Sequence, residues 1–294
     1  MRRAGERGSI TILVLWGMAI VFVLLAAAGF TTRTELMIAR NEIAAAQARH
    51  EAEAGTQLGL ARLLARRARG AALFDGSLET WRDGGITVTI AIQDEAGKID
   101  INAAPLALLT GLFVAVGRTP DEAFLLACRI AEHRGGGDPA CPAASDTEVV
   151  PRGLAFAVPE ELAALPGLDD RLYTAIADFV TVASGATAID PMVAPRAVLL
   201  ALPGATPDLV DAWLAGRSLS AALTPESAGF DMLGEMPFLM VSPLRDFTVS
   251  AVATTAEGAR SRADLQVRLT SIAAHPYEVI AWRTPPLSPG PHKR

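Results

Sequence analysis

The side chains that most often carry out catalysis are few in this sequence and lie far apart. The 294 residues contain four histidines without the close spacing of metal ligands: His50, His133, His275 and His292. The sequence contains no nucleophile elbow, phosphate-binding loop or dinucleotide-binding fingerprint. The two cysteines, Cys128 and Cys141, are too few for a zinc site of four thiolates but sufficient for one disulfide. The sequence therefore predicts a protein that is not an enzyme.

Two Leu-Pro-Gly turns between expected helices, at 165–168 and 202–205, resemble the turns of helix-hairpin-helix modules that bind DNA. DNA-binding versions usually read Gly-x-Gly, so that backbone amides can approach a phosphate. Here Asp169 and Thr206 stand where the second glycine would be, and Asp169-Asp170 would repel a phosphate. The net charge of −6 also repels nucleic acid overall. A DNA-binding module on a membrane anchor is the alternative function, and the charges favour a purely structural helix pair.

The N-terminal segment indicates where the protein resides. Three arginines precede Gly8, and the 25 residues from Gly8 to Thr32 carry no charge. Because about 20 apolar residues are enough to cross a bilayer, this run predicts a transmembrane helix. The basic residues before it place the N-terminus in the cytoplasm.

Three interpretations of this segment compete. It could be an uncleaved signal anchor, or a secretory signal cleaved after Ala26-Ala27-Ala28. The third interpretation is a prepilin leader, in which basic residues and Gly8 precede a hydrophobic helix that stays in the mature protein. A membrane peptidase then cuts between Gly8 and Ser9 and methylates the new amine of Ser9. The long apolar run and the helical pattern that continues past it argue against the cleaved secretory signal, and we favour the leader because Arg7-Gly8-Ser9-Ile10-Thr11 looks like its junction.

The helix is expected to extend well beyond the membrane. Residues 31–69 are rich in good helix formers, and their apolar side chains recur at spacings that fit one stripe. A single helix from Ser9 to Ala65 would be about 85 Å long. The simpler alternative is an ordinary surface helix of a globular domain.

The rest of the chain predicts a small sheet interrupted by helices. Alternating β-branched residues indicate four strands, with a hairpin turn at Glu257-Gly258: Ile86–Ile92, Phe247–Ala253, Ala263–Leu269 and Tyr277–Trp282. Six short helices are expected between the first two strands: Ala103–Val116, Asp121–His133, Pro159–Leu165, Asp170–Val182, Pro195–Leu202 and Pro207–Ala215. This is an α+β arrangement with a nested helical domain.

The expected helical domain contains an internal repeat. The segments 99–109 and 189–199 align at a constant offset of 90, and six of their eleven positions are identical. Asn102 is expected to cap a helix, and Pro105 to lie in its first turn. The repeat predicts two related helical subdomains.

Taken together, these segments resemble general secretion pathway protein K, the large minor pseudopilin of type II secretion. The resemblance covers nearly the whole chain and rests on the leader junction together with five further segments: residues 94–105, Pro159-Glu160-Glu161-Leu162, Leu165-Pro166-Gly167, the block Asp190…Pro195…Leu199, and a last strand ending in Trp282. The resemblance implies a pilin-like helix and antiparallel sheet, with a large SAM-like or helix-hairpin-helix-like domain inserted between strands.

It further implies a division of the chain into a leader (1–8), a transmembrane and stalk helix (9–70), a head (71–100 and 243–284), an inserted domain (101–242) and a disordered tail (285–294). The bulk of the chain is then periplasmic, on the bacterial inner membrane. The implied partners are the minor pseudopilins I and J, other pseudopilins and the prepilin peptidase, without nucleic acid. The implied function is assembly at the tip of a periplasmic filament that aids protein export.

Three site predictions follow from the resemblance. Cys128 and Cys141 would face an oxidising periplasm, and we expect them to pair. Family members can bind calcium after the first inserted helices, and four carboxylates are candidate ligands here: Glu132, Asp138, Asp146 and Glu148. A solvated glycine-rich loop is an equal alternative. Leu13 stands where most pilins have a glutamate, which suits a subunit with no neighbour above it; the general preference of a transmembrane segment for leucine is an equal alternative.

Overall fold

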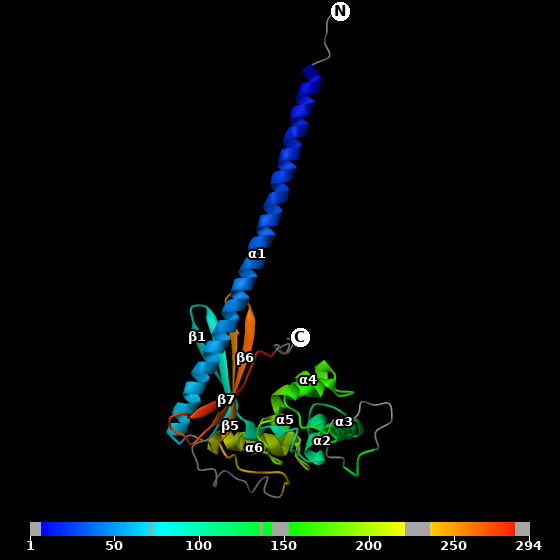
Figure 1. Cartoon of the computed structure of the whole chain (residues 1–294), viewed down its shortest axis with the longest axis vertical. Coiled ribbons are helices and arrows are strands. Elements are labelled where there is room, and N and C mark those ends of the chain that lie inside the picture. Colours follow the sequence, from blue (N-terminus) through cyan, green and yellow to red (C-terminus); the bar gives the residue numbers. More distant parts are fainter. Residues whose placement is uncertain (1–6, 71–72, 136–137, 143–152, 221–235, 286–294) are drawn as a thin grey trace, which may run out of the picture.

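A computed structural model describes residues 7–70, 73–135, 138–142, 153–220 and 236–285; the side chains of 7–11, 25–34 and 218–220 lie outside the description. One long helix projects from a head in which a sheet and a group of short helices lie side by side (Figure 1).

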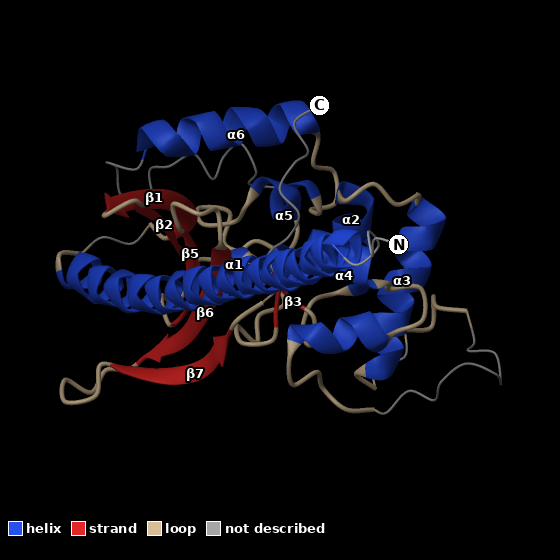
Figure 2. Ribbon diagram, turned by 90° about the horizontal axis from the view of Figure 1, so that it is seen from above, coloured by secondary structure: helices blue, strands red, loops and turns tan. Residues whose placement is uncertain are grey.

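The projecting helix is α1 (Arg7–Ala68), 62 residues long. It confirms the predicted long helix, which was possible because no proline precedes Pro105. Its C-terminal half lies across the sheet (Figure 2) and buries Ala48 and Ala52 there. Small residues let the helix approach closely: a Cβ at Gly59 would lie 2.3 Å from Val249 Cγ1.

The sheet has five antiparallel strands in the order β1-β2-β5-β6-β7, and four of them were predicted. Their bounds are β1 Asp75–Asp83, β2 Ile86–Asp94, β5 Asp246–Thr254, β6 Arg260–Leu269 and β7 Tyr277–Arg283. The sequence did not predict β1, because this edge strand is mostly exposed and lacks the alternation of a half-buried strand. The helical insertion leaves the sheet after β2 and returns before β5, which is the neighbouring strand.

One face of the sheet forms the core of the head. Alternate side chains of the three central strands point toward α1, and they include Ile90, Phe247, Val249 and Leu265. The opposite face carries polar residues such as Thr248, Asp264 and Gln266. The sheet therefore has one apolar and one polar face, as is typical of antiparallel sheets.

The inserted domain consists of short elements around its own core. Their bounds are η1 Glu95–Gly97, β3 Ile99–Asp100, α2 Leu106–Ala115, α3 Pro120–His133, η2 Pro159–Ala164, α4 Asp170–Ile176, η3 Ala177–Phe179, β4 Val180–Thr181, α5 Arg196–Leu200 and α6 Pro207–Ser220. The helix predicted over Asp170–Val182 ends early, because Val180–Thr181 forms β4 and pairs in parallel with β3. The helix predicted over Pro159–Leu165 is a 3₁₀ helix.

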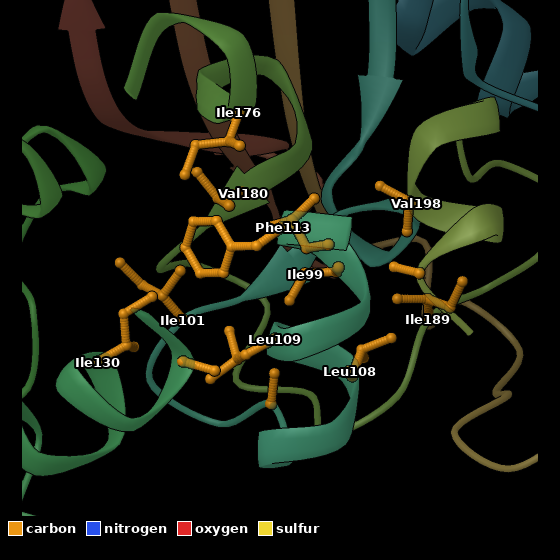
Figure 3. Packing of buried hydrophobic residues seen from close by; sticks show 14 of the residues in the cluster. Ile99, Ile101, Leu108, Leu109, Phe113, Ile130, Ile176, Val180, Ile189 and Val198 are labelled. Carbon is orange, nitrogen blue, oxygen red and sulfur yellow. The ribbon is translucent and has the colours of Figure 1, made fainter. Parts of the chain in front are cut away.

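The domain encloses a hydrophobic cluster that is separate from the core of the head. Phe113, Leu109 and Ile99 lie at its centre and are fully buried (Figure 3). Gly111 permits the closest approach within it, since a Cβ there would lie 1.9 Å from the carbonyl oxygen of Ala201. Gly111 and Ala201 stand at equivalent positions, 90 residues apart, so the continuations of the two repeats meet where α2 passes the C-cap residue of α5.

Candidate functional site

The N-terminal part of α1 carries large apolar side chains that are mostly exposed. Eleven such residues between Ile12 and Leu24 are 53–74% exposed, and Leu13 is 70% exposed. A stretch that is apolar on all sides needs an apolar environment outside the chain. Among the described residues, no helix has the length and hydropathy needed to cross a membrane.

The predicted cleavage point lies at the start of this helix. Because α1 begins at Arg7, the Gly8–Ser9 bond lies in its first turn, and the side chains there are not described. The transmembrane prediction over residues 8–32 also includes side chains outside the description. Processing and anchoring therefore remain predictions.

The two repeats of the inserted domain share a turn built on a buried aspartate. Asp100 Oδ1 accepts hydrogen bonds from the backbone N–H of Asn102 and Ala103, at 2.8 and 3.2 Å. Asp190 Oδ1 accepts one from the backbone N–H of Met192, at 2.8 Å. Each turn leads to a proline that is the N-cap residue of the next helix. The aspartates therefore fix the entry into α2 and α5.

The prediction that Asn102 caps a helix is wrong. Its side chain instead exchanges two hydrogen bonds with the backbone of Phe156, at 2.8 and 2.9 Å. The N-cap position belongs to Pro105, which has an extended φ and ψ and offers no side-chain cap. Asp100 stabilises the turn instead, because its carboxylate accepts the backbone N–H groups of the second and third residues after it.

An arginine secures each turn from a neighbouring helix. Arg134 donates to the carbonyl oxygens of Ile101 and Ala104, at 2.9 and 2.7 Å. Arg217 donates to those of Pro191 and Ala194, at 3.1 and 2.7 Å. The four carbonyls occupy equivalent positions in the repeat. Burial lowers the pKa of both guanidinium groups, and nearby carboxylates oppose that shift.

The second turn also touches the head. Ser242 donates its hydroxyl to Asp94 Oδ2 at 2.6 Å, and its backbone N–H to Asp190 Oδ2 at 2.8 Å. Burial raises the pKa of Asp94 to about 6, against the bonds from Ser242 and Ala96 and together with the charges of Asp190 and Glu95. Burial likewise raises the pKa of Asp190. Two carboxylates thus share one serine between the domains.

The two cysteines lie together in the structure. Cys128 is buried on α3, and its sulfur lies 2.06 Å from that of Cys141, with the two Cα atoms 5.6 Å apart. This places the disulfide beside the first repeat.

The candidate calcium ligands divide between described and undescribed residues. Asp146 and Glu148 lie outside the described residues. Of the other two, Asp138 Oδ1 accepts the backbone N–H of Ala140 at 2.9 Å. Within the described ranges, no three histidine, cysteine, aspartate or glutamate side chains gather as a metal site would require. The calcium site therefore remains a prediction.

No protein-family model matches the sequence, and no curated protein matches it. A solved structure does match: a chain in the crystal structure of the GspK-GspI-GspJ complex from the type 2 secretion system of enterotoxigenic Escherichia coli. The TM-score is 0.51 at 14% sequence identity, over 87% of this chain and 99% of that chain. This chain has a pilin-like fold. At this identity, the likeness shows the fold alone.

The two Leu-Pro-Gly turns have the geometry of tight turns between short elements of the inserted domain. Gly167 and Gly204 have φ angles of +79° and +84°, which suit glycine at tight turns. Asp169 then caps α4 by accepting the N–H of Leu172 at 2.8 Å. Its carboxylate occupies the helix N-terminus that a phosphate would need. The geometry therefore does not favour the DNA-binding alternative.

Sequence reasoning missed the arginines that secure the turns. Arg134 follows Asp100 by 34 residues, whereas Arg217 follows Asp190 by 27. An alignment at the fixed offset of 90 therefore does not match them. A search for arginines at the ends of the helices that follow each repeat would have found both.

Proposed function

We propose that this protein is a minor pseudopilin of a type II secretion system, anchored in the bacterial inner membrane with its head in the periplasm. One observation carries the proposal. A single helix leaves apolar residues exposed on all sides at one end and packs on a sheet at the other, and a helical domain is inserted between β2 and β5 of that sheet (Figure 1). The proposed role is assembly and contact, without catalysis.

The exposed end of α1 supports membrane anchoring. The apolar residues from Ile12 to Leu24 form part of an uncharged run of 25 residues that is long enough to span a bilayer. In this proposal the prepilin peptidase cuts between Gly8 and Ser9, and the amine of Ser9 is methylated. The arginines of the leader then stay in the cytoplasm.

Two features support a position at the tip of the filament. The inserted domain makes the head wide, and it would clash with subunits packed above it. Leu13 supplies no carboxylate that could pair with the N-terminal amine of a subunit above, and an unpaired carboxylate would be costly within a membrane. We therefore propose that the chain initiates or terminates the filament.

The proposed partners are pseudopilins, above all the counterparts of GspI and GspJ. The solved complex joins GspK, GspI and GspJ in one assembly. If this chain acts in the same way, its head should bind two different pilin-like chains.

Mass spectrometry of the mature full-length chain tests the proposal. We expect an N-methylated N-terminus at Ser9. Gly8→Val should leave the precursor uncut, whereas Gly17→Val, at a position with no atom within 4 Å, should be processed normally. A mature chain that begins at Met1 or Gly29 would overturn the assignment.

Immunogold labelling of sheared filaments tests the tip position. We expect label at one end only, and regular label along the shaft would contradict the proposal. Leu13→Glu should bring no gain in assembly, because no amine of a neighbour above awaits the new carboxylate. Co-isolation of the full-length chain with the pseudopilins I and J from detergent-treated membranes is the companion measurement for the partners.

A further inference from the structure

The head and the inserted domain do not share a hydrophobic core. The head cluster centres on Phe247 and Leu265, the inserted cluster centres on Phe113 and Leu109, and no residue belongs to both. Hydrogen bonds and ion pairs are prominent among the described contacts between the two bodies. Domains joined by a polar interface are expected to move relative to each other, unlike domains joined by a large apolar one.

We propose that the inserted domain is hinged on the head, with a joint at Ser242 and a latch of two ion pairs across the polar face of the sheet. This inference concerns the motion of the two bodies, and it holds whether or not the protein is a pseudopilin.

The joint lies where the chain leaves and re-enters the sheet. Ser242 joins Asp94, at the end of β2, to Asp190 of the second repeat. The backbone N–H of Asp190 also donates to the carbonyl oxygen of Ala96, at 2.8 Å. Leu244 turns the returning chain with a φ of 52°. These hydrogen bonds are short and lie close to both points where the chain passes between the two bodies. The inserted domain can therefore rotate about them without breaking them.

Two further contacts lie on the same side as the joint. Gln93 donates its side-chain amide to the carbonyl oxygen of Val193 at 2.9 Å, and Arg217 Nη2 lies 3.6 Å from Asp75 Oδ2. Together with Ser242 they hold the second repeat against the ends of β1 and β2. Close to the joint, buried Glu95 of η1 also reaches the sheet: its Oε2 accepts the side-chain amide of Gln266 on β6 at 3.3 Å and the hydroxyl of Thr181 on β4.

The latch lies across a crevice between the polar face of the sheet and the inserted domain. The crevice has a volume of about 480 Å³ and is lined by β6 and β7 on one side and by η2 and α4 on the other. Arg262 Nη2 of β6 lies 2.8 Å from Asp178 Oδ1, and Arg283 Nη1 of β7 lies 3.6 Å from Glu160 Oε1. Tyr173 lies among these four charges, and burial raises its pKa to about 12.

The latch is built so that it can open. Asp178 and Glu160 are 59% and 46% exposed, so water can replace their partners. Each arginine keeps a second partner on the sheet: Arg262 bonds Asp264 at 2.9 Å, and Arg283 bonds the side-chain oxygen of Gln266 at 3.1 Å. Opening therefore leaves no arginine buried without a partner.

Spin-label distance measurements on the oxidised full-length chain in detergent micelles test the hinge. One pair, Ala175→Cys on α4 and Glu278→Cys on β7, spans the crevice from two exposed positions. A second pair, Asp121→Cys and Ala175→Cys, lies within the inserted domain. The native cysteines are held in the disulfide and do not take up label in this preparation.

The matched variants are Asp178→Asn/Glu160→Gln, which removes the latch, and Asp211→Asn, which removes an exposed ion pair inside the inserted domain. We expect the latch variant to raise the population of a longer crevice distance about fivefold, the effect of losing two exposed ion pairs. Raising the salt from 50 mM to 1 M should act in the same direction in the wild-type chain.

Asp211→Asn should change neither distance, and the pair within the inserted domain should stay constant throughout. An unchanged, narrow crevice distance in the latch variant and at 1 M salt would overturn the hinge. Equal broadening of both pairs would also overturn it, because it would show loosening of the inserted domain itself.

Discussion

The turn at Asp100 and the turn at Asp190 have the same sequence pattern and similar local hydrogen bonds, but different surroundings. Asp100 Oδ2 accepts the backbone N–H of Gly185 at 2.8 Å and the hydroxyl of Ser184 at 3.2 Å, both inside the inserted domain. Asp190 Oδ2 accepts the N–H of Ser242, on the segment that returns to the head.

The difference shows how one motif serves two purposes. In the first repeat the second carboxylate oxygen, Oδ2, bonds only to groups inside the inserted domain. In the second repeat, Oδ2 bonds to the segment that returns to the sheet. Local sequence fixes the turn, and the partner of the second oxygen decides its role. Four predictions test or refine this comparison.

Removing the two aspartates should have unequal effects. Asp100→Ala removes the side-chain acceptor of four donors that are only partly buried, and it should lower the free energy of unfolding by about 2–3 kcal/mol. Asp190→Ala removes the acceptor of two such donors and also relieves the charge beside Asp94, so a loss of about 1 kcal/mol is expected. Denaturant unfolding of both variants measures the difference. Equal losses would show that the second oxygen does not distinguish the repeats.

The disulfide should stabilise only the first repeat. Cys128 and Cys141 lie 13 residues apart, and closing a loop of this size contributes about 3 kcal/mol in the chain-entropy model. Replacing both cysteines with alanine should therefore lower stability by that order and increase hydrogen exchange in α3 before α6. Thiol titration of the unfolded, unreduced chain is the direct check, and two free thiols would contradict the pairing.

The close contact between Gly111 and Ala201 should not tolerate a side chain at Gly111. Gly111→Ala places a Cβ 1.9 Å from a backbone oxygen, and about 2–3 kcal/mol of stability should be lost, because neither backbone can move aside easily. Gly216→Ala, in α6 with open space around it, is the matched control and should gain up to about 1 kcal/mol from helix propensity. Thermal unfolding of both variants compares them. A loss at Gly216 as large as at Gly111 would exclude the steric explanation.

The joint should make stability depend on pH. The pKa of Asp94 is raised from 3.8 to about 6, so between these values the folded state binds more protons than the unfolded state. The free energy of unfolding should then fall as pH rises, by about 1.5 kcal/mol between pH 5 and 7.5. Asp94→Asn should flatten this profile. A wild-type stability that rises with pH over this range would contradict the assignment.

The sequence predicted the elements whose own residues set their structure. The proline-free stretch before Pro105 predicted α1, and alternation predicted four strands of the sheet. The constant offset of 90 predicted two related helical subdomains, and the structure shows similar turns at Asp100 and Asp190. The sequence did not predict β1, whose polar side chains are mostly exposed, or β4, whose two residues become a strand only because β3 lies beside them.

The candidate site was less accessible to sequence reasoning. The Gly8–Ser9 junction could be proposed from a local pattern, and the two cysteines from their count. The partners of Asp94 and of the two arginines are set by distant segments, such as Ser242, 148 residues after Asp94. No spacing in the sequence encodes such a contact.

What the sequence by itself determined is the long helix, the alternating strands and the paired aspartate turns, because backbone propensity and short-range hydrogen bonds act within a few residues. Only the tertiary structure decided that the second turn borders the head and that the two hydrophobic clusters stay separate. It also decided that ion pairs join the head to the inserted domain. These outcomes depend on which faces meet in space, and the free energy of burying a face depends on its partner.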